Sequence, residues 1–117
     1  MPGKARPPNS DLLDELAADF GDDPEVTIGT MFRRPGLRAG GKIVVFLGFD
    51  GELIAKLPRD RGAALIEAGE AEPVAMGERT MREWFRFPAG DDTAATLERW
   101  REVTREAHRF VTGVTAG

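Results

Sequence analysis

Three side chains that could bind a partner alternate along one segment of the chain: Arg82, Trp84 and Arg86. Residues two apart in a β-strand point to the same side, so here an indole would lie between two guanidinium groups. Such a row could stack on an aromatic ring or a base, and each guanidinium could hold a carboxylate or a phosphate through two hydrogen bonds. The structural alternative is that Trp84 is half-buried beneath a helix while the arginines pair with Glu52, Glu83 or the acidic first helix.

Five further basic residues lie in the middle of the chain and could extend this candidate partner-binding surface. Residues 31–62 hold seven basic and three acidic side chains, whereas residues 1–30 hold two basic and seven acidic ones. The net charge of −4 argues against nonspecific binding of nucleic acid. The simplest interpretation of the basic residues at 31–62 is that they lie on solvent-exposed strands and loops. The five residues added to the surface are Lys56, Arg33, Arg34, Arg38 and Lys42.

The chain lacks the side chains on which most catalytic and metal sites depend. It has no cysteine and no tyrosine, one serine (Ser10) and one histidine (His108). Ser10 precedes a predicted helix and is expected to cap it, which leaves no serine for a hydrolase triad. His108 has no second histidine or cysteine with which to share a metal ion, and we expect it on the surface of the last helix. The paired carboxylates at 22–23 and 91–92 are expected to cap helices and form turns. We therefore expect no catalytic residue, no cofactor and no metal.

The length and hydropathy of the chain predict one globular domain at residues 9–114. A chain of 117 residues is long enough to bury a single core. The longest mostly apolar stretch, Ile43 to Phe49, is too short to span a bilayer, so no membrane partner is expected. Residues 1–8 hold three prolines and a glycine and predict a disordered tail rather than a signal peptide, with 115–117 as a second tail. The absence of cysteine favours the cytoplasm.

The first part of this domain predicts a helix followed by a strand. Apolar residues recur at helical spacing over residues 12–20, with acidic residues on the other face. Asn9 or Ser10 could cap this helix by accepting a hydrogen bond from a backbone amide. From residue 25 the period changes to two, which predicts a strand that continues past a kink at Pro35 and Gly36 as far as Arg38.

Two glycine-containing turns then predict antiparallel pairing. Gly40-Gly41 and Asp50-Gly51 are both typical of two-residue hairpin turns, because glycine adopts positive φ without strain. The near-continuous apolar run over residues 42–49 between them predicts a central strand buried on both faces. A third strand is expected over residues 52–57.

The remaining residues predict a helix at 59–68, a brief strand at 74–76, a clearer strand at 80–87 and a long last helix. Asp91 or Asp92 would cap that helix. The order helix, three strands, helix, two strands, helix predicts an α+β two-layer sandwich, α-β3-α-β2-α, with a mainly antiparallel sheet. The apolar stripe of the last helix comprises Leu97, Trp100, Val103, Thr104, Ala107, Phe110 and Val111.

Several short blocks lie in order between Ser10 and Phe110: Met31-Phe32, Gly36 to Ile43, Leu53 to Pro58, Ala68 to Pro73 and Met81 to Trp84. These blocks resemble the TfoX N-terminal-domain family, which is related to YjbR-like proteins. The resemblance implies the same sandwich, no catalytic residues, and a bacterial, cytoplasmic domain. The family's namesake, a regulator of competence for DNA uptake, has a further C-terminal domain, and we expect this chain to lack it. Residues 33–34 are both arginine where the family would have a glycine-containing turn.

Two functions follow as expectations. The first is a non-enzymatic interaction or regulatory domain whose open sheet face or edge binds a protein partner or another copy of itself. The alternative is a weak nucleic-acid-binding module, related to competence or transcription regulation, that holds phosphates with Arg33, Arg34, Arg38 and Lys42. The sequence leaves open whether a helix covers the face that carries Trp84.

Overall fold

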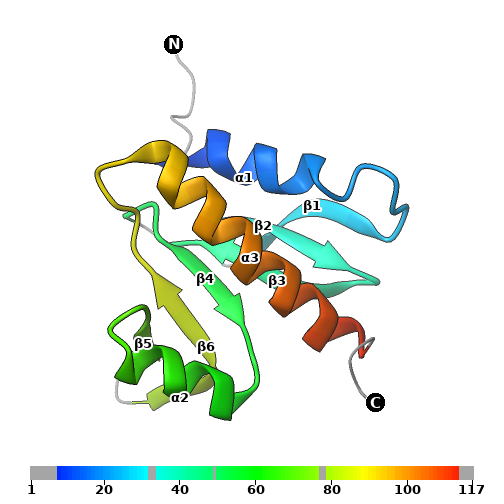
Figure 1. The fold of residues 1–117 in the computed structure, drawn as a ribbon. Coiled ribbons are helices and arrows are strands. Elements are labelled where there is room, and N and C mark those ends of the chain that lie inside the picture. Colours follow the sequence, from blue (N-terminus) through cyan, green and yellow to red (C-terminus); the bar gives the residue numbers. More distant parts are fainter. Residues whose placement is uncertain (1–7, 32–33, 49, 77–78, 114–117) are drawn as a thin grey trace.

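The structure is a computed structural model that describes residues 8–31, 34–48, 50–76 and 79–113. The described elements form two layers, with the helices on one side of a six-stranded sheet (Figure 1). All neighbouring strands are antiparallel, in the order β1-β2-β3-β4-β6-β5. The elements are α1 (Ser10–Ala18), β1 (Val26–Met31), β2 (Arg34–Ala39), β3 (Lys42–Leu47), β4 (Leu53–Lys56), α2 (Arg59–Glu67), β5 (Glu72–Met76), β6 (Arg79–Phe87) and α3 (Thr93–Thr112).

The α+β class and the antiparallel sheet are confirmed, but one predicted strand is wrong. The segment expected to run from residue 25 to Arg38 is two strands, β1 and β2, which pair from Val26 opposite Ala39 to Met31 opposite Arg34. The described order is therefore α-β4-α-β2-α rather than α-β3-α-β2-α. The apolar positions are even-numbered in β1 (Val26, Ile28) and odd-numbered in β2 (Leu37, Ala39). Because the residues at 31–34 are not typical of a turn, this change of phase resembles a kink at Pro35 and Gly36 within a single strand.

The two predicted hairpins are confirmed, and their glycines help to fix the register of the central strands. Gly40 and Gly41 have φ of 57° and 85°, the left-handed values that a tight hairpin turn requires, and Ala39 pairs with Lys42 across them. Gly51 has φ of 81° between β3 and β4. This second loop is longer than the two residues expected, because the hairpin closes at Gly48 and Glu52, where the Gly48 amide donates to the Glu52 carbonyl at 2.8 Å. Within β3, Val44, Val45, Phe46 and Leu47 are all buried, as predicted for a central strand.

The helix caps agree with the prediction at one end of the chain and differ at the other. The Asp92 side chain accepts a hydrogen bond of 3.2 Å from the Ala95 amide at the start of α3, as expected. The sequence predicted a side-chain cap of α1 by Asn9 or Ser10. Ser10 is the first residue of the helix rather than its cap, and Asn9 occupies the N-cap position but makes no capping hydrogen bond with its side chain. Its side-chain amide instead donates to the Gly51 carbonyl at 2.8 Å, and only its backbone carbonyl accepts from the first turn. Asn9 therefore ties α1 to the β3–β4 turn.

One buried core joins the helices to the facing side of the sheet. Val45, Ala55 and Phe85 lie opposite one another on β3, β4 and β6, and all of them belong to the core. Leu47, Leu53 and Phe87 form the next row in the same way. Side chains alternate along a strand, so the residues between these two rows point away from the helices. In the described part of the chain, no helix is both long and apolar enough to cross a bilayer.

Candidate functional site

The side of the sheet that faces away from the helices holds some of the aromatic and basic residues singled out by the sequence. On β4 and β6, Lys56 lies opposite Trp84 and Ile54 lies opposite Arg86. Ala55 and Phe85 between them point into the core, so these neighbours must point the other way. Phe46 of β3, opposite Ile54, shares this side. We call Phe46, Ile54, Lys56, Trp84 and Arg86 the open-face row. Phe46 and Ile54 in this row are buried, and Lys56, Trp84 and Arg86 are partly exposed.

Trp84 is half-buried, but none of the described helices covers it. Its ring contacts Phe46 edge to face, with centroids 5.4 Å apart and planes at 69°. The Lys56 ammonium lies 5.7 Å from the indole centroid, within the range of a cation–π interaction. Neighbours in the sheet therefore hold the indole in place while part of it stays accessible. The sequence had left open whether a helix covers this face.

Arg86 is surrounded by carboxylates rather than available to a ligand. Its Nε donates to Glu52 Oε2 at 2.9 Å, one Nη donates to Glu72, and the other lies 3.7 Å from Asp50 Oδ2. The pairing with Glu52 is the one that the structural alternative predicted. Because Glu52, Glu72 and Asp50 occupy its donors, Arg86 acts here as a cross-link between β6, β5 and the β3–β4 turn.

Glu52 is the most enclosed member of this ion-pair cluster, with its side chain 11% exposed. Burial by itself would raise the pKa of Glu52. Backbone hydrogen bonds, including one of 3.0 Å from the Asp50 amide to Oε1, and the Arg86 guanidinium outweigh that effect, and the pKa is lowered from its ordinary value. Its carboxylate occupies the space where a Cβ at Gly48 would lie, so a larger residue at that position would displace the Glu52 carboxylate from its ion pair.

This lowered pKa predicts that acid weakens the fold through Glu52. A carboxyl group with a lower pKa in the folded state stabilises it fully above the unfolded-state value of about 4.3, and loses that contribution as the pH falls through the lower folded value. We expect Glu52→Gln to reduce stability at pH 7 by about 1–2 kcal/mol, given the partial exposure of Arg86. The difference from wild type should shrink below about pH 4, as measured by urea unfolding. An equal loss at pH 7 and pH 3 would contradict this role of Glu52.

The basic residues of β2 serve the sheet itself. Arg38 donates from Nη1 to the Gly41 carbonyl at 3.1 Å and from Nη2 to the Thr30 carbonyl at 2.9 Å. Its side chain crosses Gly29, where a Cβ would approach Arg38 Nε to 2.9 Å. Arg34 is buried. These positions leave Arg38 and Arg34 less accessible to a phosphate backbone than the sequence suggested.

The described structure does not place the remaining residues of the predicted partner-binding surface beside Trp84. Lys42 is exposed at the start of β3 and lines a different cavity, away from Trp84. Arg33 and the side chain of Arg82 lie outside the described residues. Of the predicted surface, the described structure therefore brings together Lys56, Trp84 and Arg86.

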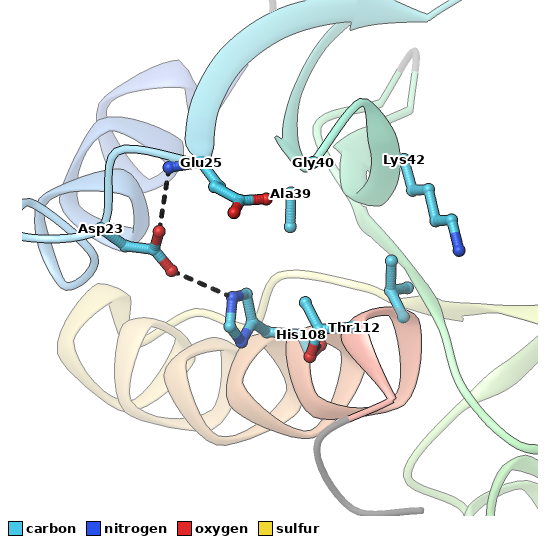
Figure 2. A pocket seen from close by; sticks show the side chains of 8 residues that line it. Asp23, Glu25, Ala39, Gly40, Lys42, His108 and Thr112 are labelled. Carbon is cyan, nitrogen blue, oxygen red and sulfur yellow. Dashed lines mark hydrogen bonds and ion pairs between the residues drawn. The ribbon is translucent and has the colours of Figure 1, made fainter.

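The cavity beside Lys42, of about 430 Å³, lies between the end of α3, the turn before β1 and the β2–β3 turn (Figure 2). His108 stacks on Phe20 with ring centroids 4.7 Å apart, and its Nε2 lies 3.7 Å from Asp23 Oδ2. Asp23 Oδ1 accepts from the Glu25 amide at 2.9 Å, which confirms the expected turn. The expectation of a surface histidine is wrong, since the His108 side chain is only 18% exposed.

The polar side chains beside this cavity hold two parts of the fold together. The Asp23 carboxylate accepts from the Glu25 amide and lies 3.7 Å from His108 Nε2, beyond hydrogen-bond length. The contact of Asp23 with His108 joins the end of α3 to the turn before β1, while Thr112 Oγ1 donates to the His108 carbonyl at 2.8 Å within α3. The sequence offered no sign of this contact, because Asp23 and His108 lie far apart in the chain.

Among the residues that the structure describes, no group of three or more histidine, aspartate or glutamate side chains is placed to hold a metal ion. Comparison with known proteins found no match, whether among family models, curated proteins or solved structures.

Proposed function

We propose that this chain is a cytoplasmic, non-enzymatic interaction domain of the TfoX N-terminal type, and that it binds a protein partner on the open-face row. The observation that supports this most is Trp84, an indole held by Phe46 and Lys56 on the side of the sheet away from the described helices. Tryptophan is among the residues most enriched where binding energy concentrates in protein interfaces. A residue already ordered in the free protein loses little entropy on binding.

The surroundings of Trp84 indicate the chemistry of the partner. The exposed part of the indole favours an apolar or aromatic side chain, and the Lys56 ammonium beside it favours a carboxylate. Asp50 and Glu72 lie at the other end of the row, around Arg86, and Asp50 is 82% exposed. A partner segment that carries an aromatic residue next to an acidic one, with a basic residue further along, would match these charges.

The non-enzymatic part of the proposal rests on composition. With no cysteine or tyrosine, one serine and one histidine, the chain is poor in nucleophiles and in general acids and bases that work near neutral pH. Ser10 is buried at the start of α1, and His108 is packed against Phe20.

The alternative, a weak nucleic-acid-binding module, has less support. Its proposed phosphate contacts included Arg38, which donates to two backbone carbonyls, and Arg34, which is buried. Carboxylates also surround Arg86 on the open face, and they would repel a phosphate backbone.

The test compares Trp84→Ala with Phe110→Ala, which removes a half-buried aromatic ring from α3 on the other side of the sheet. Partners captured from native extract by wild type would be identified by quantitative mass spectrometry, then titrated as purified proteins. We expect Trp84→Ala to weaken binding about thirtyfold or more, the effect of losing about 2 kcal/mol at a central contact, while Phe110→Ala binds as wild type does.

A partner that binds all three proteins equally would contradict the proposal. A parallel titration with single-stranded and duplex DNA addresses the alternative. Binding at low salt that falls steeply as salt rises, and that survives Trp84→Ala, would favour the nucleic-acid module instead.

A further inference from the structure

The two edges of the sheet differ in how well they are protected. An edge strand presents unpaired backbone N–H and C=O groups, and natural proteins block such edges with charges, prolines and bulges. The β5 edge has Glu72 and Pro73, and its pairing with β6 is interrupted by a bulge between Pro73 and Val74. The β1 edge spans Val26–Met31 with neither a charged residue nor a proline, and its pairing with β2 is regular throughout.

The centre of the unprotected edge carries an exposed apolar side chain. Ile28 is 53% exposed, and within the described part of the chain no other large hydrophobic residue is as accessible. Ile28 lies opposite Leu37, a core residue, so its side chain projects on the helix side of the sheet, at the rim. An exposed isoleucine in the middle of an open edge is typical of a surface that another strand covers.

The backbone of β1 shows which groups face outward. The Gly40 amide donates to the Glu25 carbonyl at 3.0 Å, and in an antiparallel pair the residues bonded to the neighbour recur at every second position. The odd-numbered residues of β1 therefore bond to β2, and Val26, Ile28 and Thr30 direct their N–H and C=O groups to the free edge. Thr30 fits this assignment because it lies opposite Pro35, which has no N–H.

The ends of the edge are partly occupied and its centre is not. The Thr30 carbonyl accepts from Arg38, and the Val26 amide donates to the Asp23 carbonyl at 3.2 Å. No described residue pairs with the outward backbone groups of Ile28, which lie beyond the last strand of the sheet.

We propose that two copies of this chain pair through β1, antiparallel, about a two-fold axis at Ile28. This register places Ile28 opposite the partner's Ile28 and Val26 opposite the partner's Thr30. The Ile28 pair then exchanges two backbone hydrogen bonds, and each Thr30 amide donates to the partner's Val26 carbonyl. The Thr30 carbonyl keeps its bond to Arg38, since a carbonyl oxygen has two lone pairs. Two six-stranded sheets become one continuous sheet.

A second copy fits this edge better than an unrelated strand because a two-fold axis makes one surface complementary to itself. Here the exposed Ile28 side chain and the unpaired backbone groups of Ile28 lie on the same axis. No charged residue within Val26–Met31 opposes the pairing of the two copies.

The test measures the molar mass of the whole chain by light scattering and sedimentation from about 5 µM to about 500 µM, because dimerisation follows mass action. Wild type should pass from monomer to dimer as concentration rises. Ile28→Lys adds a charge to the edge, and Thr30→Pro removes an outward N–H that β2 does not use. Both should raise the dissociation constant at least tenfold, and Ala64→Lys, the same type of charge change on the exposed side of α2, should not alter it.

A wild-type chain that stays monomeric at every concentration would overturn the proposal, and so would dimers that both edge variants form normally. Circular dichroism establishes that each variant is folded. Amide exchange on wild type gives an answer without any substitution: the Ile28 and Thr30 amides should exchange more slowly as concentration rises, and unchanged exchange would count against the edge. The open-face row is a different surface, so Trp84→Ala should still dimerise. Loss of partner binding and loss of dimerisation are thus separable.

Discussion

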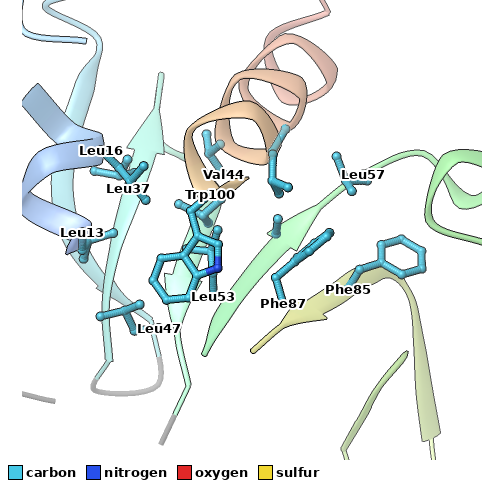
Figure 3. Close-up of a cluster of buried hydrophobic side chains, with 14 of the residues drawn as sticks. Leu13, Leu16, Leu37, Val44, Leu47, Leu53, Leu57, Phe85, Phe87 and Trp100 are labelled. Atoms are coloured by element: carbon cyan, nitrogen blue, oxygen red, sulfur yellow. The ribbon is translucent and has the colours of Figure 1, made fainter. Parts of the chain in front are cut away.

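Replacing Trp100 by alanine is expected to lower the free energy of unfolding by about 3–5 kcal/mol. Trp100 is 1% exposed and is among the largest fully buried side chains. Its indole projects from α3 toward the sheet (Figure 3) and belongs to the same buried cluster as Leu13 and Leu53. A domain of this size is stable by only about 5–15 kcal/mol, so the variant should lose a large part of its stability.

Urea unfolding followed by circular dichroism measures this loss, and Trp84→Ala is the matched control. Trp84 is half-buried on the other side of the sheet, so removing its ring leaves a smaller cavity and should cost about 1–2 kcal/mol. A larger loss for Trp84→Ala than for Trp100→Ala would contradict the assignment of the two faces. The same comparison keeps the binding test interpretable, because it shows whether Trp84→Ala is folded.

Gly62→Ala is expected to destabilise the protein by about 1–3 kcal/mol through overpacking. Gly62 is buried in α2, and a Cβ at this position would overlap the Phe85 ring, which belongs to the core. Alanine is normally better than glycine in a helix by about 0.5–1 kcal/mol, so an observed loss measures the clash in excess of that gain. The absence of a side chain here lets α2 approach β6 closely.

A double-mutant cycle with Phe85→Leu isolates this contact. Leucine removes the part of the ring that a Cβ would meet, so Gly62→Ala should cost less in the Phe85→Leu background than in wild type. Thermal or urea unfolding of the four proteins gives the coupling energy. Purely additive effects would mean that the helix and the ring do not compete for the same space.

Local sequence signals predicted most of the fold, and a reversal without such a signal was missed. The turns at Gly40-Gly41 and Asp50-Gly51 and the cap at Asp92 were predicted because each depends on one residue's own backbone or side-chain chemistry. The reversal between β1 and β2 was missed because no glycine, proline or asparagine lies between Met31 and Arg34. The change of phase of the apolar positions, from Ile28 to Leu37, resembles the effect of a kink at Pro35 and Gly36.

The candidate site was predictable along one strand and not across strands. Alternation along β6 placed Trp84 and Arg86 on one side, and an ion pair of Arg86 with Glu52 was among the alternatives. The contacts of Trp84 with Phe46 and Lys56 depend on β6 pairing with β4 rather than only with β5, its neighbour in sequence. Which strands pair is decided by packing of the whole core, and no spacing within a segment encodes it.

The position of β6 also has a consequence for how the chain folds. The strands β1 to β4 pair in sequence order, so they can form from contacts between near neighbours, which are fast to make. β6 can pair with β4 only after α2 and β5 have been synthesised. α3 then has to pack on β3 and β4 to cover them. Until it does, Leu37, Val45 and Leu47 face water on an incomplete sheet, a state prone to aggregation. During synthesis from the N-terminus, the strands with these apolar side chains are therefore made before the helix that covers them.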